Sequence, residues 1–356
     1  MNRLELLQSR ITETADCGII TDDVNRRYFT GMKSSAGTLL VFPQESVFII
    51  DFRYIEKAKK TVTDCKVLLE DSGRVTQQIK KIIADHGAKT AAVDIETCTV
   101  LQLEKYKKAL GAEIVSTIKF ADMIRQIRMI KTPDEIKKMI AAQRIAEQGL
   151  EHMLDFIRVG RTEKEIQLEL DYYMLSHGAE GLSFDTIALS GKNTSLPHGV
   201  PSDKEVQSGE FVLMDFGAVV EGYHSDMTRT VCVGKPDEEM ERVYNIVLRA
   251  QLAAINQLKA GIDGKELDKI ARDIITREGY GGCFGHSLGH GVGMEIHENP
   301  YSTPGRSIIL PENSVITIEP GIYIENRFGV RIEDFAVVTK EGCLNMTKAP
   351  KELICI

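Results

Sequence analysis

The first part of the chain, up to about residue 122, alternates short apolar runs with segments of helical periodicity. Apolar runs bounded by Gly, Pro or charged residues predict strands, whereas apolar residues three and four positions apart predict helices. Strands are predicted at residues 37–42, 46–51, 66–70, 90–96 and 113–118, and helices near residues 75–86 and 100–110. Strands that alternate with helices indicate a small α/β domain.

A strong helix-start signal follows this region. Thr132 can cap a helix, Pro133 stands at its first position, and Glu135 completes a capping box. A long amphipathic helix is therefore predicted to begin there, directly after a basic stretch. We place the domain boundary just before it and predict domains at residues 1–125 and 126–356.

The second domain repeats one arrangement, in which two helices are followed by a β segment that carries two acids. In the first copy the helices fall within residues 133–177 and the strands within 211–233. In the second copy the helices fall within residues 236–278 and the strands within 314–338. This repeat predicts an internal pseudo-duplication with one site shared between its halves.

Composition limits the classes of binding partner and the cellular compartment that we expect for this chain. The formal net charge of -8 argues against a large basic surface, so neither nucleic acid nor an anionic membrane is an expected partner. The 7 cysteines are scattered and form no C-x-x-C pair, which argues against a disulfide framework or a zinc knuckle. We see neither a signal-peptide core nor the roughly 20 apolar residues that span a bilayer. We expect a soluble, cytoplasmic protein.

Four acidic residues interrupt apolar runs of the second domain. Asp215 lies within one such run, and Asp226 follows across a turn, so a hairpin can place the two carboxylates opposite each other on one face. Glu319 and Glu333 repeat this pattern in the second β segment. Buried like charges repel strongly unless they are protonated, paired with Arg or Lys, or bound to divalent cations. Cations account for all four acids at once.

Histidines gather in the same part of the chain. An imidazole with four carboxylates suits manganese, cobalt, iron or zinc better than calcium or magnesium. Any one of these acids or histidines is as simply explained by a structural role, and only their combination favours a metal site. The glycine repeat at residues 289–293 is not a dinucleotide fingerprint, because no helix follows it. The histidines concerned are His198, His224, His286, His290 and His297.

The candidate ligands occur in the order Asp215, Asp226, His290, Glu319 and Glu333, among the motifs LPHGV, GHGVGMEIHE, TIEPGIY and GVRIED. This arrangement resembles the pita-bread metallopeptidases, and among them the Xaa-Pro peptidases. The preceding residues, with NRRYFTGM and DFRY, resemble the creatinase-type N-terminal domain of that family. The resemblance implies an α+β fold, with a pita-bread catalytic domain after a smaller α/β domain.

The resemblance also implies a dinuclear site with two divalent metal ions per subunit. Asp226 and Glu333 would bridge the ions, Asp215 would complete one, and His290 with Glu319 would complete the other. A hydroxide that bridges the ions would attack the carbonyl carbon of an Xaa-Pro bond. We expect manganese, with cobalt, zinc and iron also compatible with this set of ligands.

Further roles follow from the same resemblance. Glu319 would manage the proton of the attacking water, and His198 and His297 would contact the substrate or its tetrahedral intermediate. His286 and Arg331 would lie around the metal-binding and substrate-contacting residues and hold them in position. The implied partner is a proline-containing peptide, and the implied assembly is a homodimer.

Three alternatives remain open. A creatinase-like hydrolase shares both domains but works without metal, and its members do not keep these five ligands. A catalytically silent relative would bind peptides in the same cleft, although such chains usually lose ligands. Methionine aminopeptidases share the metal site but typically lack an N-terminal domain of this size. The sequence does not decide between dipeptides and longer peptides as substrates.

Overall fold

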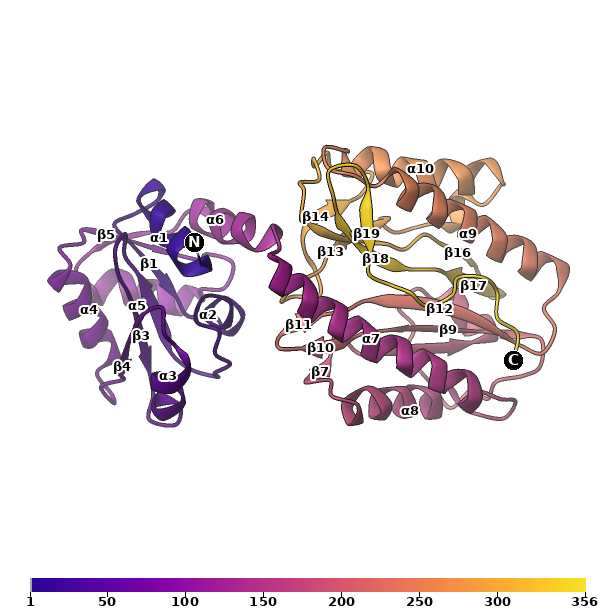
Figure 1. The fold of residues 1–356 in the computed structure, drawn as a ribbon, viewed down its shortest axis with the longest axis horizontal. Helices are drawn as coiled ribbons and strands as arrows, with labels where there is room; N and C mark the ends of the chain where they lie inside the picture. Colours follow the sequence, from indigo (N-terminus) through magenta and orange to yellow (C-terminus); the bar gives the residue numbers. More distant parts are fainter. Residues whose placement is uncertain (1) are drawn as a thin grey trace. The chain divides into compact units, whose positions relative to one another are not determined.

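The computed structural model describes residues 2–356 (Figure 1). The chain divides into two compact units, Met1–Arg128 and Met129–Ile356. No helix within residues 2–356 is both long and apolar enough to cross a membrane.

The N-terminal unit is a six-stranded mixed sheet with helices. The strand order is β4-β3-β2-β1-β5-β6. The strands are β1 (Cys17–Ile20), β2 (Thr38–Val41), β3 (Ser46–Ile50), β4 (Lys66–Leu69), β5 (Thr90–Val93) and β6 (Glu113–Val115). The helices are α1 (Arg3–Arg10), α2 (Asp23–Thr30), α3 (Ile55–Thr61), α4 (Val75–Asp85), α5 (Val100–Ala109) and α6 (Ile118–Met129), with a short 3-10 helix at Ile11–Glu13.

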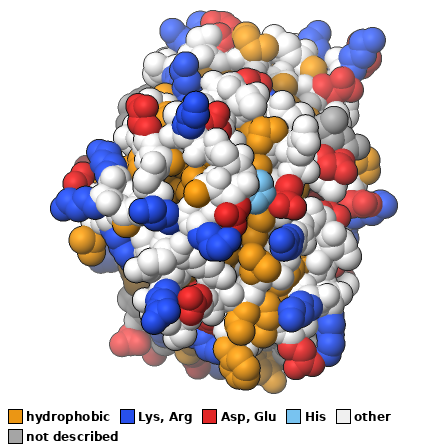
Figure 2. Space-filling view, turned by 90° about the vertical axis from the view of Figure 1, so that its left-hand side faces the viewer, with side chains coloured by type: hydrophobic (Ala, Val, Ile, Leu, Met, Phe, Trp, Pro, Cys, Tyr) orange, Lys and Arg blue, Asp and Glu red, His pale blue; other side chains and the backbone are white. Residues whose placement is uncertain are grey.

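The pattern of apolar residues predicted most of this unit. All five predicted strands and both predicted helices are present. The elements that were not predicted include the central strand β1 and the helices α2 and α6. Strand β1 is short and fully buried, so its sequence carries no alternation to reveal it. On the face shown in Figure 2, Lys and Arg side chains are mixed with Asp and Glu side chains.

The C-terminal unit places two helix pairs around several small sheets. The helices are α7 (Pro133–Phe156), α8 (Glu163–Ser176), α9 (Glu238–Gln257) and α10 (Gly264–Arg277). The strands of its first half are β7 (Gly181–Leu182), β8 (Ile187–Ser190), β9 (Glu210–Phe216), β10 (Ala218–Val220), β11 (Tyr223–His224) and β12 (Met227–Val233). Those of its second half are β13 (Gly289–Gly291), β14 (Glu298–Ser302), β15 (Val315–Ile318), β16 (Gly321–Ile324), β17 (Phe328–Arg331), β18 (Asp334–Val338) and β19 (Cys343–Asn345). Two 3-10 helices, Gly191–Ser195 and Gly281–Cys283, complete the unit.

The predicted repeat is present in this unit. Helices α7 and α8 precede the antiparallel pair β9 and β12, and helices α9 and α10 precede the antiparallel pair β15 and β18. Each helix pair packs with its own β segment into a separate apolar cluster. In Figure 1 the strands lie between the two helix pairs, so residues from both halves can meet at one site.

Local sequence sets the starts of the first helix pair. The predicted capping box at α7 forms, with Thr132 accepting from the Glu135 amide and Glu135 accepting from the Thr132 amide. Thr162 and Glu165 form the same arrangement at α8. Each box satisfies two backbone N–H groups that a helix start leaves without partners.

Candidate active site

The first two acids come from the pair β9 and β12, but not in the predicted register. Thr228, not Asp226, lies opposite Asp215 in the ladder. The chain between the strands forms β10 and β11, and Asp226 precedes β12 by one residue. Asp226 is therefore a diagonal neighbour of Asp215. Because Asp226 and Thr228 are two residues apart, the face of the strand predicted for Asp226 is still the right one.

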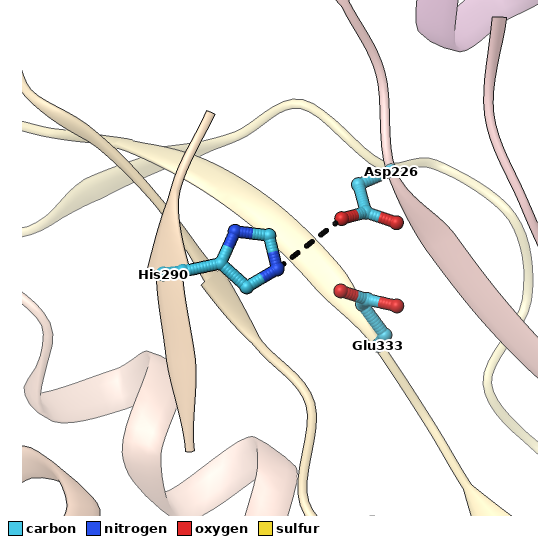
Figure 3. A group of neighbouring side chains, drawn as sticks. All are labelled: Asp226, His290 and Glu333. Atoms are coloured by element: carbon cyan, nitrogen blue, oxygen red, sulfur yellow. Dashed lines mark ion pairs between the residues drawn. The ribbon is translucent and has the colours of Figure 1, made fainter. Parts of the chain in front are cut away.

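Asp226, His290 and Glu333 converge from three separate segments (Figure 3). One ligand atom from each lies within 4.8 Å of the others. The His290 Nε2 atom is 3.5 Å from Asp226 Oδ2 and 3.4 Å from Glu319 Oε1. The structure thus brings together four of the five predicted ligands.

Asp215 lies in the same cavity, beside a cation of the protein. Its Oδ2 atom is 2.5 Å from Nη2 of the buried Arg331. Its Oδ1 atom is buried and accepts no hydrogen bond from any of residues 2–356. One carboxylate oxygen of Asp215 therefore lacks the partner that a buried acceptor requires.

The cavity around these residues measures about 440 Å³. Ligand sites typically measure roughly 300 to 1,000 Å³. All of the predicted site residues line this cavity. They are His198, Asp215, Asp226, His286, His290, His297, Glu319, Arg331 and Glu333.

The acids of this cavity are buried close together, and few positive charges of the protein lie near them. Burial, reinforced by the neighbouring carboxylates, raises the pKa of Asp226 and of Glu333 well above their ordinary values. Burial also raises the pKa of Glu319 to about 8, although Arg331 opposes the rise. Arg331 is the one Lys or Arg that lines the cavity within residues 2–356. A single guanidinium cannot neutralise four carboxylates.

His290 is held with one ring nitrogen toward the acids. Its Nδ1 atom lies 3.1 Å from the carbonyl oxygen of Gly291, and its backbone N–H donates to Thr317 Oγ1 at 3.0 Å. Burial, with the nearby His297, lowers the pKa of His290 to about 3. The ring is therefore neutral at physiological pH, which is the form that binds metal ions.

Close packing around His290 explains the flanking glycines. A Cβ atom on Gly289 would overlap the carbonyl group of Thr317, and one on Gly291 would overlap the backbone of β14. Glycine lets β13 approach both neighbours closely enough to place the imidazole beside the acids. The glycine repeat thus has a packing role.

The remaining predicted histidines occupy different positions. His286 Nε2 lies 2.9 Å from the Tyr323 hydroxyl, and burial with the charge of Arg331 lowers the His286 pKa to about 4. His297 packs edge-on against His290, with ring centroids 4.3 Å apart. His198 is exposed on a loop at the cavity wall.

Two contributors were missed from the sequence. The Tyr323 hydroxyl accepts from Arg331 Nη1 at 2.8 Å and so links His286 to Arg331. Thr228 donates its hydroxyl to Glu333 Oε2 at 2.7 Å and accepts from Arg331 Nε at 3.0 Å. The only local signal for Thr228 is that it is a polar residue two positions after a predicted ligand. Tyr323 carries no signal beyond its place in the motif.

The donor set fits divalent cations. The four predicted acidic ligands and the neutral His290 surround a space that is also lined by the exposed Asp185 and by one guanidinium. Within residues 2–356, one buried oxygen of Asp215 has no hydrogen-bond partner. Oxygen ligands with one imidazole suit manganese, cobalt, iron or zinc. Binding such ions would displace protons from acids whose pKa values are raised.

Fold and cavity together define a two-domain protein of the pita-bread class with an acid-rich site in its C-terminal unit. Comparison with protein-family models identifies the family. The metallopeptidase family M24 matches residues 137–340, and the creatinase/prolidase N-terminal domain matches residues 3–130. The chain belongs to metallopeptidase family M24, which confirms the predicted family, fold class and enzyme class.

Similar proteins cover nearly the whole chain. The Xaa-Pro dipeptidase of Pyrococcus horikoshii is 39% identical over 341 residues, which are 95% of this chain and 94% of the relative. A structure of an Xaa-Pro dipeptidase from Bacillus anthracis has a TM-score of 0.96 at 41% identity and covers 99% of both chains. A structure of an X-Pro aminopeptidase from Thermotoga maritima has a TM-score of 0.93 at 38% identity, covering 98% of this chain and 99% of that one.

Proposed function

We propose that this chain hydrolyses the Xaa-Pro peptide bond, in dipeptides or at the N-terminus of longer peptides, at a dinuclear metal site. The observation that carries the proposal is the convergence of the four predicted acidic ligands and His290 in a single cavity, where Arg331 is the one Lys or Arg among the lining residues of the described range 2–356. Relatives named as Xaa-Pro dipeptidases and as an X-Pro aminopeptidase support the substrate class. The proposed catalytic domain is residues 126–356.

Two divalent ions are assigned to the predicted ligands. Asp215, Asp226, His290, Glu319 and Glu333 would hold these ions through their carboxylate oxygens and the imidazole nitrogen. Ions held by these residues would supply a water of lowered pKa as the nucleophile and would polarise the scissile carbonyl.

Side chains of the cavity would handle the proton and the substrate. When the bond breaks, the proline nitrogen must gain a proton, as the leaving nitrogen of any hydrolysed peptide bond does. Glu319 lies in the cavity and is assigned to carry the proton of the attacking water, at a carboxyl oxygen, toward this nitrogen. His198 and His297 line the cavity and are assigned to the substrate carbonyl and its tetrahedral intermediate.

The cavity also has a wall suited to a proline ring. A ring with no N–H to donate is best recognised by apolar contact. The apolar and aromatic residues that line the cavity are Phe184, Ile187, Pro197, Ile296 and Tyr301.

The test is hydrolysis of Ala-Pro and Ala-Pro-Ala by chelator-treated protein, before and after manganese, cobalt or zinc is returned. Cleavage of both peptides only after metal return supports an Xaa-Pro aminopeptidase, and cleavage of Ala-Pro alone supports a dipeptidase. Full activity without metal would favour a creatinase-like hydrolase. Metal binding without cleavage of either peptide would favour a peptide-binding role.

Three finer assignments belong to the same proposal. Manganese as the native ion is tested by metal analysis of protein purified without added metal. A homodimer is tested by light scattering at low concentration. A cytoplasmic location is tested by cell fractionation.

A further inference from the structure

A second buried polar cluster contacts the backbone of Glu333 and the side chain of Asp334. Its centre is Arg229 on β12, whose side chain is only 2% exposed. A guanidinium has five N–H donors, and all five of Arg229 are used. Nε donates to Pro350 O at 2.8 Å, Nη1 to Thr228 O at 2.9 Å and Glu333 O at 2.6 Å, and Nη2 to Asp334 Oδ1 at 2.8 Å and Ala349 O at 2.9 Å.

These bonds hold the backbone of Glu333, which lies in the connection between two strands. Glu333 lies between β17 and β18, outside both strands. Its N–H donates to Thr228 O at 3.2 Å, and its carbonyl oxygen accepts from Arg229. Two consecutive residues of β12 thus hold both backbone polar groups of Glu333, and Thr228 also holds its side chain.

Asp334 and the end of the chain anchor Arg229 in turn. Asp334 is fully buried and accepts from Arg229 Nη2, from Asn345 Nδ2 at 2.7 Å and from Gln251 Nε2 at 3.2 Å. Lys351 Nζ lies 2.6 Å from Asp334 Oδ2. Residues 349–351 therefore supply two carbonyl acceptors and one ammonium group to this cluster.

We propose that Arg229 is a positioning residue for Glu333, held in place by Asp334 and by residues 349–351 of the C-terminal segment. Arg229 does not line the cavity and acts only through Glu333. Partners that orient a metal ligand typically contribute 10- to 100-fold to metal affinity or activity. The proposal rests on the assignment of Glu333 as a metal ligand.

The test compares manganese binding by metal-stripped, full-length chains, measured by titration calorimetry. Arg229→Lys keeps the charge but loses the five-donor fork, and its affinity for manganese should fall by about 10- to 100-fold. Excess manganese should restore most of kcat for Ala-Pro, with KM little changed. A role confined to stability would lower the melting temperature without this dependence on metal concentration.

Arg144→Lys is the matched control. Arg144 also donates to a carbonyl near the C-terminus, that of Met346, at 2.6 Å, but it makes no bond to Glu333 or Asp334. Its manganese affinity should stay within about twofold of the unmodified chain. Equal losses in Arg144→Lys and Arg229→Lys would overturn the proposal, as would unchanged affinity in a folded Arg229→Lys.

A second pair of variants covers the case in which Arg229→Lys does not fold. Lys351→Met and Asn345→Ala each remove one partner of Asp334, so a smaller loss of a few-fold in manganese affinity is expected from each. Unchanged affinity in both would reject the proposal. Because binding is measured without substrate, the result stands apart from whether the chain cleaves Xaa-Pro bonds.

Discussion

Glu333 and Asp334 are neighbours in sequence and almost equally buried, at 2% and 0% exposure, but they belong to two different electrostatic regions. Glu333 faces the cavity, where burial and the nearby acids raise its pKa. Asp334 faces the Arg229 cluster. Burial alone would raise the pKa of Asp334, but the charges of Arg229 and Lys351 hold it below its ordinary value.

The contrast lies in the source of positive charge. Behind the cavity the chain supplies its own cations to one carboxylate, so that region is complete as folded. In the cavity, residues 2–356 supply one guanidinium to the four predicted acidic ligands and Asp185. Buried acids that lack protein cations are a sign that an external cation completes the site.

The largest effect is expected from Asp226→Asn, which removes a proposed metal ligand. Manganese affinity and Ala-Pro hydrolysis should fall by more than about a hundredfold, beyond the range for partners that only orient ligands. The measurements are titration calorimetry and steady-state kinetics. In metal-free protein the same change should leave the melting temperature unchanged or higher, because it removes a buried acid without a cation. A marked loss of metal-free stability would contradict the view that the folded chain leaves the charge of this acid uncompensated.

Asp334→Asn, in contrast, should lower the stability of the metal-free protein. It leaves the buried Arg229 and the largely buried Lys351 without their carboxylate, and breaking such a pair typically costs about 3–5 kcal/mol. Denaturant unfolding of metal-free protein measures this loss. Glu333→Gln is the adjacent control and should cost far less stability. Similar losses in the two variants would remove the distinction between the regions.

Metal-free protein should lose stability as the pH rises from about 6.5 to about 8. Folded Glu319 keeps its proton up to its pKa of about 8, whereas the unfolded side chain releases it above about 4.5, so the folded state binds more protons in this window. His290 and His286 have lowered pKa values and act in the opposite direction, but only below their ordinary value of 6.5.

Each group that behaves like Glu319 contributes a slope of about 1.4 kcal/mol per pH unit. Thermal unfolding at several pH values measures the slope, which Glu319→Gln should reduce. Saturating manganese should remove it, because the ion replaces the protons. A stability that rises over the same window would show that these acids are ionised without metal.

The smallest effect is expected at a solvated ion pair of the N-terminal unit. Glu56 and Lys60 are 2.6 Å apart on α3, with side chains 84% and 71% exposed. Glu56→Gln should change stability by less than about 0.5 kcal/mol, because water already solvates both charges. Denaturant unfolding checks this value, and a larger loss would mean that exposure is a poor guide to the contribution of an ion pair here.

Local signals in the sequence were sufficient where neighbouring residues decide the outcome. The boxes at Thr132 with Glu135 and at Thr162 with Glu165 involve residues three apart, so the helix starts could be predicted. The repeated helix pairs and acid-bearing strands followed from apolar spacing in the same way. The five candidate ligands were found because each acid interrupts an apolar run and all five stand in a family-like order.

Other features depend on which strands meet and in what register. Thr228 rather than Asp226 lies opposite Asp215, because β10 and β11 interrupt the simple hairpin. Arg331 was predicted to support the site, but its ion pair with Asp215 spans 116 residues and has no local pattern.

The sequence therefore identified the fold class and the chemical types gathered in the C-terminal domain. Tertiary structure decided which of two adjacent carboxylates, Glu333 or Asp334, receives cations from the chain. The Arg229 to Asp334 bond joins residues 105 apart, and Lys351 reaches Asp334 only because the C-terminal segment packs beside β12. Burial makes an acid dependent on a cation, and only the packing of distant segments determines whether the protein provides one.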